Sequence, residues 1–166
     1  SKRGTALLPL IGLGWGPDKG TIKLTAASPD AEMAKLGHSV YDDNAFMMLV
    51  RETFKGATTV VVYVINPGTK ATVTAEGITL TAAYGGTRGN DISVACVAEA
   101  GKDTFAVKVY LEADVAEEYT GLSTVADLIA ANSGNYVVFT AESTEAKLTA
   151  FASAKLTGGA DGTVSN

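Results

Sequence analysis

The spacing of hydrophobic positions changes near residue 66, and this change predicts two structural units. Residues 5–12 and 60–65 are apolar with little interruption, which is typical of strands covered on both faces by other layers. Asn66-Pro67-Gly68 is a strong chain break, and short strands that alternate apolar and polar residues follow it. The pattern predicts an α+β fold: a small α/β unit (strand-helix-strand) followed by an antiparallel β-sandwich with one short helix.

Helices are expected between the two apolar runs of the first unit. One helix is predicted over residues 28–36, with Ser28 as its N-cap, Pro29 at its first position and Gly37 at its end. A second helix is predicted to begin at Asp42 or Asp43 and to end at Gly56. Its apolar stripe at helical spacing contains Phe46, Leu49, Val50 and Phe54. This order predicts a crossover connection between parallel strands.

In the second unit, alternation predicts half-buried strands. Their inward positions are Ile78, Leu80 and Ala82, then Ile92, Val94 and Cys96, then Phe105, Val107, Val109 and Leu111. Further strands are predicted at 115–120 and 135–140, separated by a helix that begins with a Thr124–Asp127 capping box. Residues 144–166 lack periodicity and are interpreted as a return toward the first unit. The predicted division is therefore 1–68, 69–142 and 143–166.

Composition and charge exclude several classes of protein. The chain has 166 residues, of which 46% are hydrophobic and 19% charged, as in an ordinary globular protein. The net charge is −5 and the basic residues are dispersed, so we expect no nucleic-acid partner. The apolar runs fall short of the roughly 20 residues that a spanning helix needs, so no membrane insertion is expected. One cysteine, Cys96, allows no internal disulfide, which suits a reducing cytoplasm.

Two glycine clusters are candidates for nucleotide binding, but neither completes a known fingerprint. Gly12-x-Gly14-x-Gly16 has Pro17 where the dinucleotide fingerprint needs its last glycine. Residues 84–92 lack the Gly-Lys-Ser/Thr ending of a phosphate-binding loop. Both clusters are better explained by turn geometry, and no cofactor is predicted.

The titratable residues show no pattern of a catalytic or metal site. His38 is the only histidine and has no partner at metal-ligand spacing, so a surface or capping role is favoured. Cys96 lies on the apolar side of a predicted strand and is expected to be a buried, unreactive thiol. The adjacent acids at 42–43 and 117–118 are neighbours that point apart, which disfavours paired acid–base chemistry. No catalytic and no metal-binding residue is predicted.

Four residues in glycine-rich turns are candidates for a subunit interface or a structural turn: Trp15, Arg88, Asn90 and Asp91. Trp15 is either a binding platform or a cap on the core of the first unit, and packing is favoured. Asn90 and Asp91 can close the turn by bonding backbone amides. Arg88 stands at the tip, where it either makes bidentate contact with a carboxylate of a neighbouring subunit or is exposed or bonded locally. Both interpretations of Arg88 stay open.

Three motifs together carry a family resemblance. Gly12-Leu13-Gly14-Trp15-Gly16-Pro17, the stretch from Tyr84 to Ile92, and Leu156-Thr157-Gly158-Gly159-Ala160-Asp161-Gly162 stand in the order found in contractile tail sheath proteins of bacterial viruses and prophages, which the chain resembles. The resemblance implies that the sandwich is inserted in a larger α/β domain of subtilisin-like topology without protease activity. It also implies that the chain is part of a longer subunit that carries linking arms at both ends.

The function implied by the resemblance is structural. Sheath copies polymerise helically around a tail tube and contract to drive the tube through the bacterial envelope. The expected partners are other copies of the sheath protein and the tail tube protein, and the expected location is the virion tail, assembled in the host cytoplasm. The 166 residues alone, lacking the arms, are expected to be monomeric. The alternative is a surface- or carbohydrate-binding β-sandwich module of a phage-like particle. A hydrolase is disfavoured by the single histidine and the lack of a nucleophile elbow.

Overall fold

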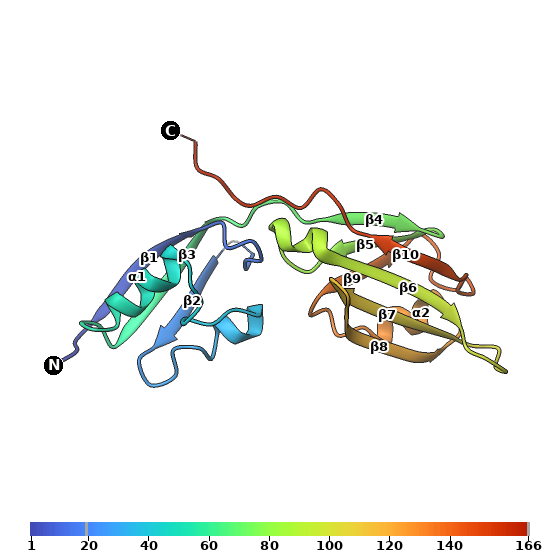
Figure 1. Cartoon of the computed structure of the whole chain (residues 1–166), viewed down its shortest axis with the longest axis horizontal. Helices are drawn as coiled ribbons and strands as arrows, with labels where there is room; N and C mark the ends of the chain where they lie inside the picture. Colours follow the sequence, from blue (N-terminus) through green and yellow to red (C-terminus); the bar gives the residue numbers. More distant parts are fainter. Residues whose placement is uncertain (19, 166) are drawn as a thin grey trace.

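The computed structural model describes residues 1–18 and 20–165, which form two lobes joined near one edge (Figure 1). The first lobe contains β1 (Thr5–Ile11), β2 (Gly20–Thr25), the 3₁₀ turn η1 (Met33–Leu36), α1 (Ala45–Thr53) and β3 (Thr59–Asn66). The second lobe contains β4 (Thr72–Ala75), β5 (Ile78–Ala82), the 3₁₀ turn η2 (Thr87–Asp91), β6 (Ile92–Ala98), β7 (Phe105–Leu111), β8 (Asp114–Leu122), α2 (Val125–Ala131), β9 (Val137–Ala141) and β10 (Phe151–Lys155). The predicted α+β fold class is confirmed.

The first lobe is a three-stranded sheet with α1 against one of its faces (Figure 1). The strand order is β1-β3-β2, with β1 parallel and β2 antiparallel to the central β3. Its core lies between the sheet and the helical segments, and its fully covered residues include Leu10, Met33, Met47, Val50, Val60, Val62 and Val64. The predicted strand-helix-strand unit with a parallel connection is therefore present.

The first predicted helix, over residues 28–36, is wrong. Only the turn η1 forms there, and Ser28 pairs with Thr25 in an isolated bridge. The Asp30 carboxylate accepts hydrogen bonds from the Val40 N–H at 2.5 Å and from the Ser39 hydroxyl at 3.2 Å, which folds the segment into a loop. Met33 and Leu36, the buried residues of this turn, are three apart, a spacing that a single 3₁₀ turn satisfies.

The second helix is present, although its start, its end and its buried face differ from the prediction, since α1 ends at Thr53 and not at Gly56. Asn44 is the N-cap and its side chain accepts the N–H of Met47 at 2.9 Å, so α1 begins later than Asp42 or Asp43. The buried positions of α1 are Met47 and Val50, whereas Leu49 of the predicted stripe is 47% exposed.

The two apolar runs of the first lobe are covered on one face only, contrary to the prediction. Alternate residues of β1 and β3 turn away from α1, and among them Leu7 is 67% and Tyr63 is 42% exposed. Because these exposed residues of β1 and β3 are also apolar, the sequence pattern predicted that both faces of the strands are buried. The chain described here supplies a covering layer for the other face alone.

The second lobe is a sandwich of two antiparallel sheets, ordered β10-β6-β7-β8 and β4-β5-β9. The predicted inward residues of β5 and β6 are all buried, as are Val107 and Val109 of β7. The predicted capping box at α2 is present, with reciprocal bonds between Thr124 and Asp127. The alternation of the sequence therefore located these strands correctly.

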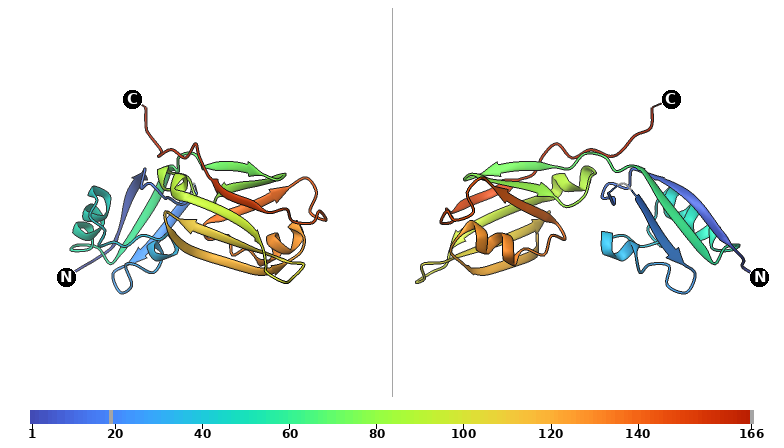
Figure 2. Two further views of the ribbon diagram at one scale, coloured as in Figure 1. Left: turned by 45° about the vertical axis from the view of Figure 1, so that its right-hand side comes forward. Right: turned by 180° about the vertical axis from the view of Figure 1, so that it is seen from behind.

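The segment interpreted as a return toward the first lobe contains a strand that the sequence did not predict; its residue 166 lies outside the described residues. Residues 151–155 form β10, which pairs with β6 at an edge of the sandwich. None of its residues is fully buried and its register shifts between Phe151 and Ala154, so it has no clear alternation in the sequence. Beyond β10 the chain runs beside residues 66–72 and extends over the first lobe, as both views of Figure 2 show.

Candidate functional site

The three glycine-rich motifs converge where the two lobes meet. We define the lobe junction as residues 12–17, 66–69, 84–90 and 157–162. Isolated bridges connect Gly16 with Gly85 and residue 69 with residue 160, and the hydrogen bond from the Gly86 N–H to the Thr69 carbonyl, at 3.1 Å, joins the two pairs of segments. Figure 1 shows that the lobes face each other here, with the C-terminal segment running alongside the link between β3 and β4. The junction is thus a crossing of chain segments that lie far apart in the sequence.

Several junction glycines lie too close to neighbouring backbone for any side chain. A Cβ atom at Gly86 would overlap the carbonyl group of Gly14, and Gly86 has φ +121° and ψ 165°, a conformation that glycine alone adopts readily. A Cβ at Gly68, also at positive φ, would overlap the carbonyl oxygen of Ala160. The same overlap with backbone carbonyl oxygens would occur at Gly85, Gly159 and Gly162. These glycines therefore allow direct backbone contact between the segments.

Backbone hydrogen bonds hold the crossing segments. The Arg88 N–H donates to the Gly14 carbonyl at 2.8 Å, and the Gly16 N–H donates to the Gly85 carbonyl at 3.1 Å. Thr69 and Ala160 exchange two hydrogen bonds, of 2.8 and 3.1 Å. Because these bonds join main chain to main chain, the link between the lobes behaves as a short piece of sheet and not as a free linker.

Two side chains complete the junction. The Asn90 amide donates to the Gly159 carbonyl at 2.9 Å and accepts the Gly159 N–H at 2.8 Å. Asp161 Oδ1 accepts the N–H of Thr87 at 2.9 Å and its hydroxyl at 3.2 Å. Asn90 does bond a backbone amide, but that amide lies 69 positions away and not in its own turn. The Asp161 contact was missed because no local spacing signals it.

Trp15 crosses from the first lobe into the core of the second. It is 6% exposed and belongs to the sandwich core, where its ring meets Tyr84 edge-on with centroids 5.2 Å apart. Packing was the favoured interpretation, but the core that Trp15 fills is that of the other lobe. His38 Nε2 donates to the Trp15 carbonyl oxygen at 2.5 Å, and His38 Nδ1 lies 3.4 Å from the Asp42 carboxylate. The hydrogen bond from His38 thus holds the backbone of Trp15 at the point where the tryptophan side chain enters the core of the second lobe.

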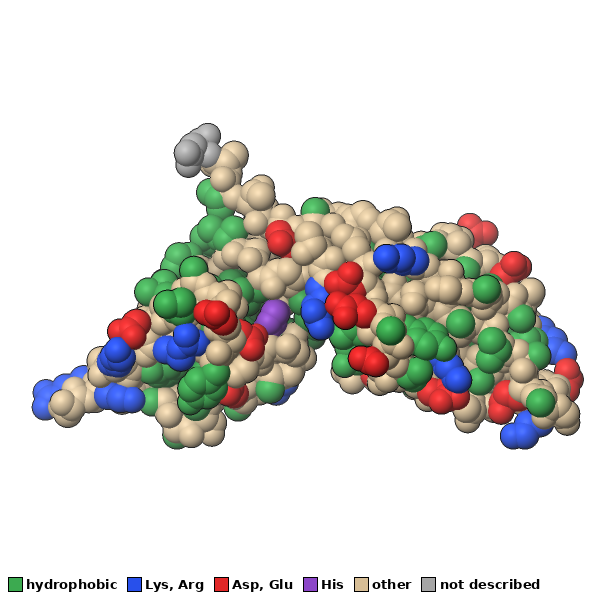
Figure 3. Space-filling view, in the orientation of Figure 1, with side chains coloured by type: hydrophobic (Ala, Val, Ile, Leu, Met, Phe, Trp, Pro, Cys, Tyr) green, Lys and Arg blue, Asp and Glu red, His purple; other side chains and the backbone are tan. Residues whose placement is uncertain are grey.

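Arg88 and Asp91 differ from the other two candidates. Arg88 donates its backbone N–H to Gly14, whereas its guanidinium is exposed and makes no hydrogen bond or ion pair with any residue in 1–18 or 20–165. It lines the polar notch between the lobes together with His38, whose ring is visible at the notch in Figure 3. Asp91 accepts the Glu112 N–H with its backbone carbonyl. Of the four candidates, Arg88 is the one that is exposed.

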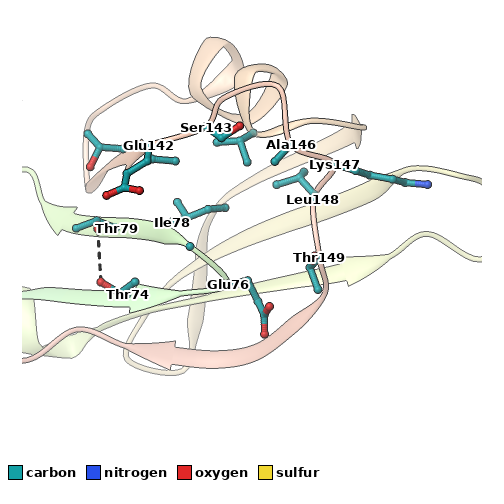
Figure 4. A pocket seen from close by; sticks show the side chains of 14 residues that line it. Thr74, Glu76, Ile78, Thr79, Glu142, Ser143, Ala146, Lys147, Leu148 and Thr149 are labelled. Carbon is teal, nitrogen blue, oxygen red and sulfur yellow. Dashed lines mark hydrogen bonds between the residues drawn. The ribbon is translucent and has the colours of Figure 1, made fainter.

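A second hollow lies in the sandwich, between the β4–β5 hairpin and residues 140–149 (Figure 4). Its volume is about 640 Å³, its wall carries hydroxyl and carboxylate groups such as Thr79 and Glu142, and Ile78 and Leu148 contribute apolar surface. None of the described residues that line it is aromatic, so it offers no stacking platform for a sugar ring. Within residues 1–18 and 20–165 no three acids, histidines or cysteines stand close enough to bind a metal ion. The hollow therefore gives the carbohydrate-binding alternative no specific support.

The perturbed titratable groups lie in the sandwich, away from the lobe junction. Burial raises the pKa of the Cys96 thiol to about 11, so the thiol stays protonated. The pKa of Glu99 is lowered, chiefly by the hydrogen bond from the Gly121 N–H and then by the Thr104 hydroxyl. The pKa of Asp127 is lowered by the backbone N–H groups at the start of α2. The hydrogen bonds that lower the pKa of Glu99 and Asp127 hold a turn of the sandwich and the start of α2.

Comparison with known proteins assigns the class. Residues 66–161, more than half of the chain, match the family described as "Phage tail sheath protein beta-sandwich domain". The chain therefore belongs to the phage tail sheath protein family, and the resemblance carried by the three motifs is confirmed. In the part of the chain that the structure describes, no helix is long and apolar enough to cross a membrane.

Several relatives are similar to this chain. The phage-like element PBSX protein XkdK of Bacillus subtilis is 39% identical over 95 residues, which are 57% of this chain and 19% of XkdK. The solved sheath tail proteins of Desulfitobacterium hafniense and Listeria innocua are each 33% identical, with TM-scores of 0.75 and 0.74. Each covers 99% of this chain, which spans 37% and 36% of those chains. The chain thus corresponds to little more than a third of the solved relatives.

Proposed function

We propose that this chain is part of a subunit that polymerises helically around a tail tube and contracts to drive the tube through a bacterial envelope. Membership of the sheath family supports a structural role, and the observation that carries the mechanical proposal is the lobe junction. A subunit that transmits movement needs lobes that keep their relative orientation under load. Direct backbone contact at glycines and paired hydrogen bonds supply that stiffness.

Through the lobe junction the two lobes behave as one rigid body. To rotate the sandwich against the first lobe, the hydrogen bonds from the Arg88 N–H to Gly14 and from the Gly16 N–H to Gly85 must break, and Trp15 must leave the sandwich core. Each hydrogen bond contributes about 1 kcal/mol, and removing a large aromatic side chain from a core costs about 3 kcal/mol. Rotation within the subunit is therefore costly, and we expect rigid subunits to change neighbours during contraction.

The proposed partners are other copies of the same protein and a tail tube protein, and the proposed location is the tail of a virion or virion-like particle assembled in the host cytoplasm. Head-to-tail contacts that do not close into a ring generate such a helix. Arg88, whose guanidinium is exposed at the notch, is a proposed contact to a carboxylate of a neighbouring copy. The role needs no catalytic residue. The 166 residues by themselves are proposed to be monomeric.

Co-expression of the complete sheath subunit with its tube protein tests this function. Electron microscopy is expected to show tubes clad in helically arranged sheath, and Arg88→Ala is expected to shorten or thin the cladding. Lys108→Ala serves as a matched cation control, because Lys108 already pairs with Glu118 within the sandwich at 4.0 Å. Bare tubes with the unaltered subunit would contradict the proposal. Equal cladding by both variants would remove Arg88 from the interface while leaving the sheath role intact.

A further inference from the structure

A groove runs between the two lobes, beside the lobe junction. It consists of three hollows that share their walls: Gly37 lines all three, Arg88 lines two, and Trp15 and Tyr136 together line two. Figure 3 shows the notch where the groove opens, with His38 beside it. Because neighbouring hollows have wall residues in common, they are successive parts of one groove.

The middle of the groove is a small apolar socket. Its volume is about 200 Å³, and the side chains in its wall are those of Trp15, Ile92, Leu111, Tyr136 and Arg88. The socket is smaller than the roughly 300–1,000 Å³ of a typical small-molecule site. All of its side chains except the arginine are apolar or aromatic, so the socket fits one apolar side chain of a protein partner.

The part of the groove next to the socket is polar, with a volume of about 610 Å³. Arg88 lines both parts, so its exposed side chain stands where they meet. Within the described part of the chain the Arg88 guanidinium has no ion-pair partner. The carboxylate of Asp91, which also lines the polar part, accepts no hydrogen bond from the described residues. The groove therefore presents one cation and one hydrogen-bond acceptor beside an apolar socket.

These groups match a peptide segment better than a small ion. A carboxylate on the segment bonds the Arg88 guanidinium bidentately, and a backbone N–H donates to Asp91. A free anion would gain the arginine but would also face the Asp91 carboxylate, which repels it. The socket beside Arg88 adds the requirement for an apolar side chain. The groove thus selects an extended segment in which an apolar residue adjoins an acidic one.

We propose that the groove receives such a segment from a neighbouring copy of the complete sheath subunit, with its apolar side chain in the socket and its carboxylate on Arg88. The inference rests on the proposed assembly of sheath copies and specifies what the neighbouring copy contributes. Membership of the sheath family implies an oligomeric sheath, which supplies that copy. The C-terminal segment, residues 157–165, runs along the edge of the molecule opposite the opening between the lobes (Figure 1), so it leads away from the groove.

An occupied groove would also hold the two lobes together. Trp15 and Gly37 belong to the first lobe, whereas Leu111 and Tyr136 belong to the second. The groove therefore keeps its shape only while the lobes keep their relative orientation. A segment that binds this arrangement alone stabilises it, so each contact between copies opposes rotation within the copy that receives it.

Cross-linking between isotopically distinct copies identifies the occupant. In the complete subunit, Asn135→Cys at the end of the groove is labelled with a thiol-reactive benzophenone, while Cys96 is buried and stays unlabelled. Labelled copies with natural nitrogen are assembled around the tube protein with an excess of unlabelled copies in heavy nitrogen, then illuminated, digested and analysed by mass spectrometry. Val97→Cys, 44% exposed at the far end of β6, is the control.

A variant that fills the socket measures what the contact contributes. Leu111→Trp in the complete subunit is expected to raise the concentration needed for sheath assembly by at least roughly tenfold, as loss of a central apolar anchor does at other interfaces. Val97→Trp, at the far end of the sandwich, is expected to leave that concentration unchanged. The melting temperature of each unassembled variant shows whether it folds, and the cross-linking decides the question if Leu111→Trp does not.

The proposal expects cross-links from Asn135→Cys to heavy peptides in which an apolar residue adjoins Asp or Glu. Cross-links only to natural-nitrogen peptides, which place the occupant in the same copy, would overturn it. So would cross-links only to the tube protein, or no more cross-links than Val97→Cys gives. Normal assembly of folded Leu111→Trp would also overturn it, while cladding by the unaltered subunit leaves the sheath role standing. Bare tubes with the unaltered subunit would remove the sheath role and this inference with it.

Discussion

Replacing Gly86 by alanine is the sharpest test of the lobe junction. Gly86 lies at φ +121° and ψ 165°, and an added Cβ would overlap the carbonyl group of Gly14 and lie 2.9 Å from the Trp15 nitrogen. The nearest atoms belong to backbone, which cannot swing aside as a flexible side chain can. The alanine variant must therefore separate the segment 84–88 from the segment 12–16.

The cost of Gly86→Ala follows from the contacts that separate. An alanine held in this backbone region is strained by about 1–3 kcal/mol. The hydrogen bonds from the Arg88 N–H to Gly14 and from the Gly16 N–H to Gly85 are lost or lengthened, at about 1 kcal/mol each. The sum is about 3–5 kcal/mol, a large part of the roughly 5–15 kcal/mol that stabilises an ordinary domain. The melting temperature is expected to fall on the order of 10 °C.

Urea unfolding and calorimetry measure this change, with Gly101→Ala as the control. Gly101 also has a positive φ, +71°, but a Cβ there would meet no atom within 4 Å, so this variant costs only backbone strain, about 1 kcal/mol. Gly86→Ala is further expected to split unfolding into two transitions, since the lobes no longer support each other. Equal losses of stability in the two variants, with a single transition in both, would refute the close-contact argument.

Three further outcomes test other parts of the structure. Asn90→Ala leaves the N–H and C=O of Gly159 without their partner, so it is expected to lower the free energy of unfolding by about 1–3 kcal/mol. The control Asn135→Ala, at an exposed site, is expected to change that free energy by less than about 1 kcal/mol. Urea titration of both variants measures the difference. The lowered pKa of Glu99 contributes stability that is present at neutral pH and is lost as the pH falls through that pKa. The difference in unfolding free energy between native protein and Glu99→Gln is therefore expected to be full at neutral pH and to shrink as the pH falls below the ordinary glutamate pKa of about 4.3. An equal difference at neutral pH and in strong acid would contradict this. The Cys96 thiol, with a pKa near 11, is expected to react with a disulfide reagent only at the rate of unfolding, and prompt reaction in buffer would show that β6 is open.

The sandwich could be predicted from the sequence because its strands are half-buried. In a strand with one face in the core, every second residue is apolar, as Ile92, Val94 and Cys96 are in β6. Strand β10 escaped prediction because it pairs at an edge and buries none of its residues completely. The helix predicted at 28–36 failed because Asp30 bonds across the loop to Val40, a tertiary contact that outweighs local helix signals.

The candidate site was foreseen in its residues but not in its geometry. Glycine clusters at 12–16, 85–89 and 158–162 indicated turns with unusual backbone angles, since glycine permits conformations that other residues avoid. That these turns meet depends on contacts between residues as distant as Asn66 and Thr163, which no local pattern encodes. Trp15 illustrates the limit: its burial was predicted from its chemistry, whereas the lobe that buries it follows only from the fold.

The central claim is that a sheath subunit carrying this chain moves as one rigid piece while its contacts with other copies change. Cryo-electron microscopy of the assembled particle, before and after contraction, tests it most directly. If the subunit is rigid, residues 5–18 and 20–161 superpose as a single body in the two states, with Asn90 still bonded to Gly159 and the contacts between subunits rearranged. A rotation of the sandwich against the first lobe about residues 66–72, or a sheath whose length never changes, would contradict it.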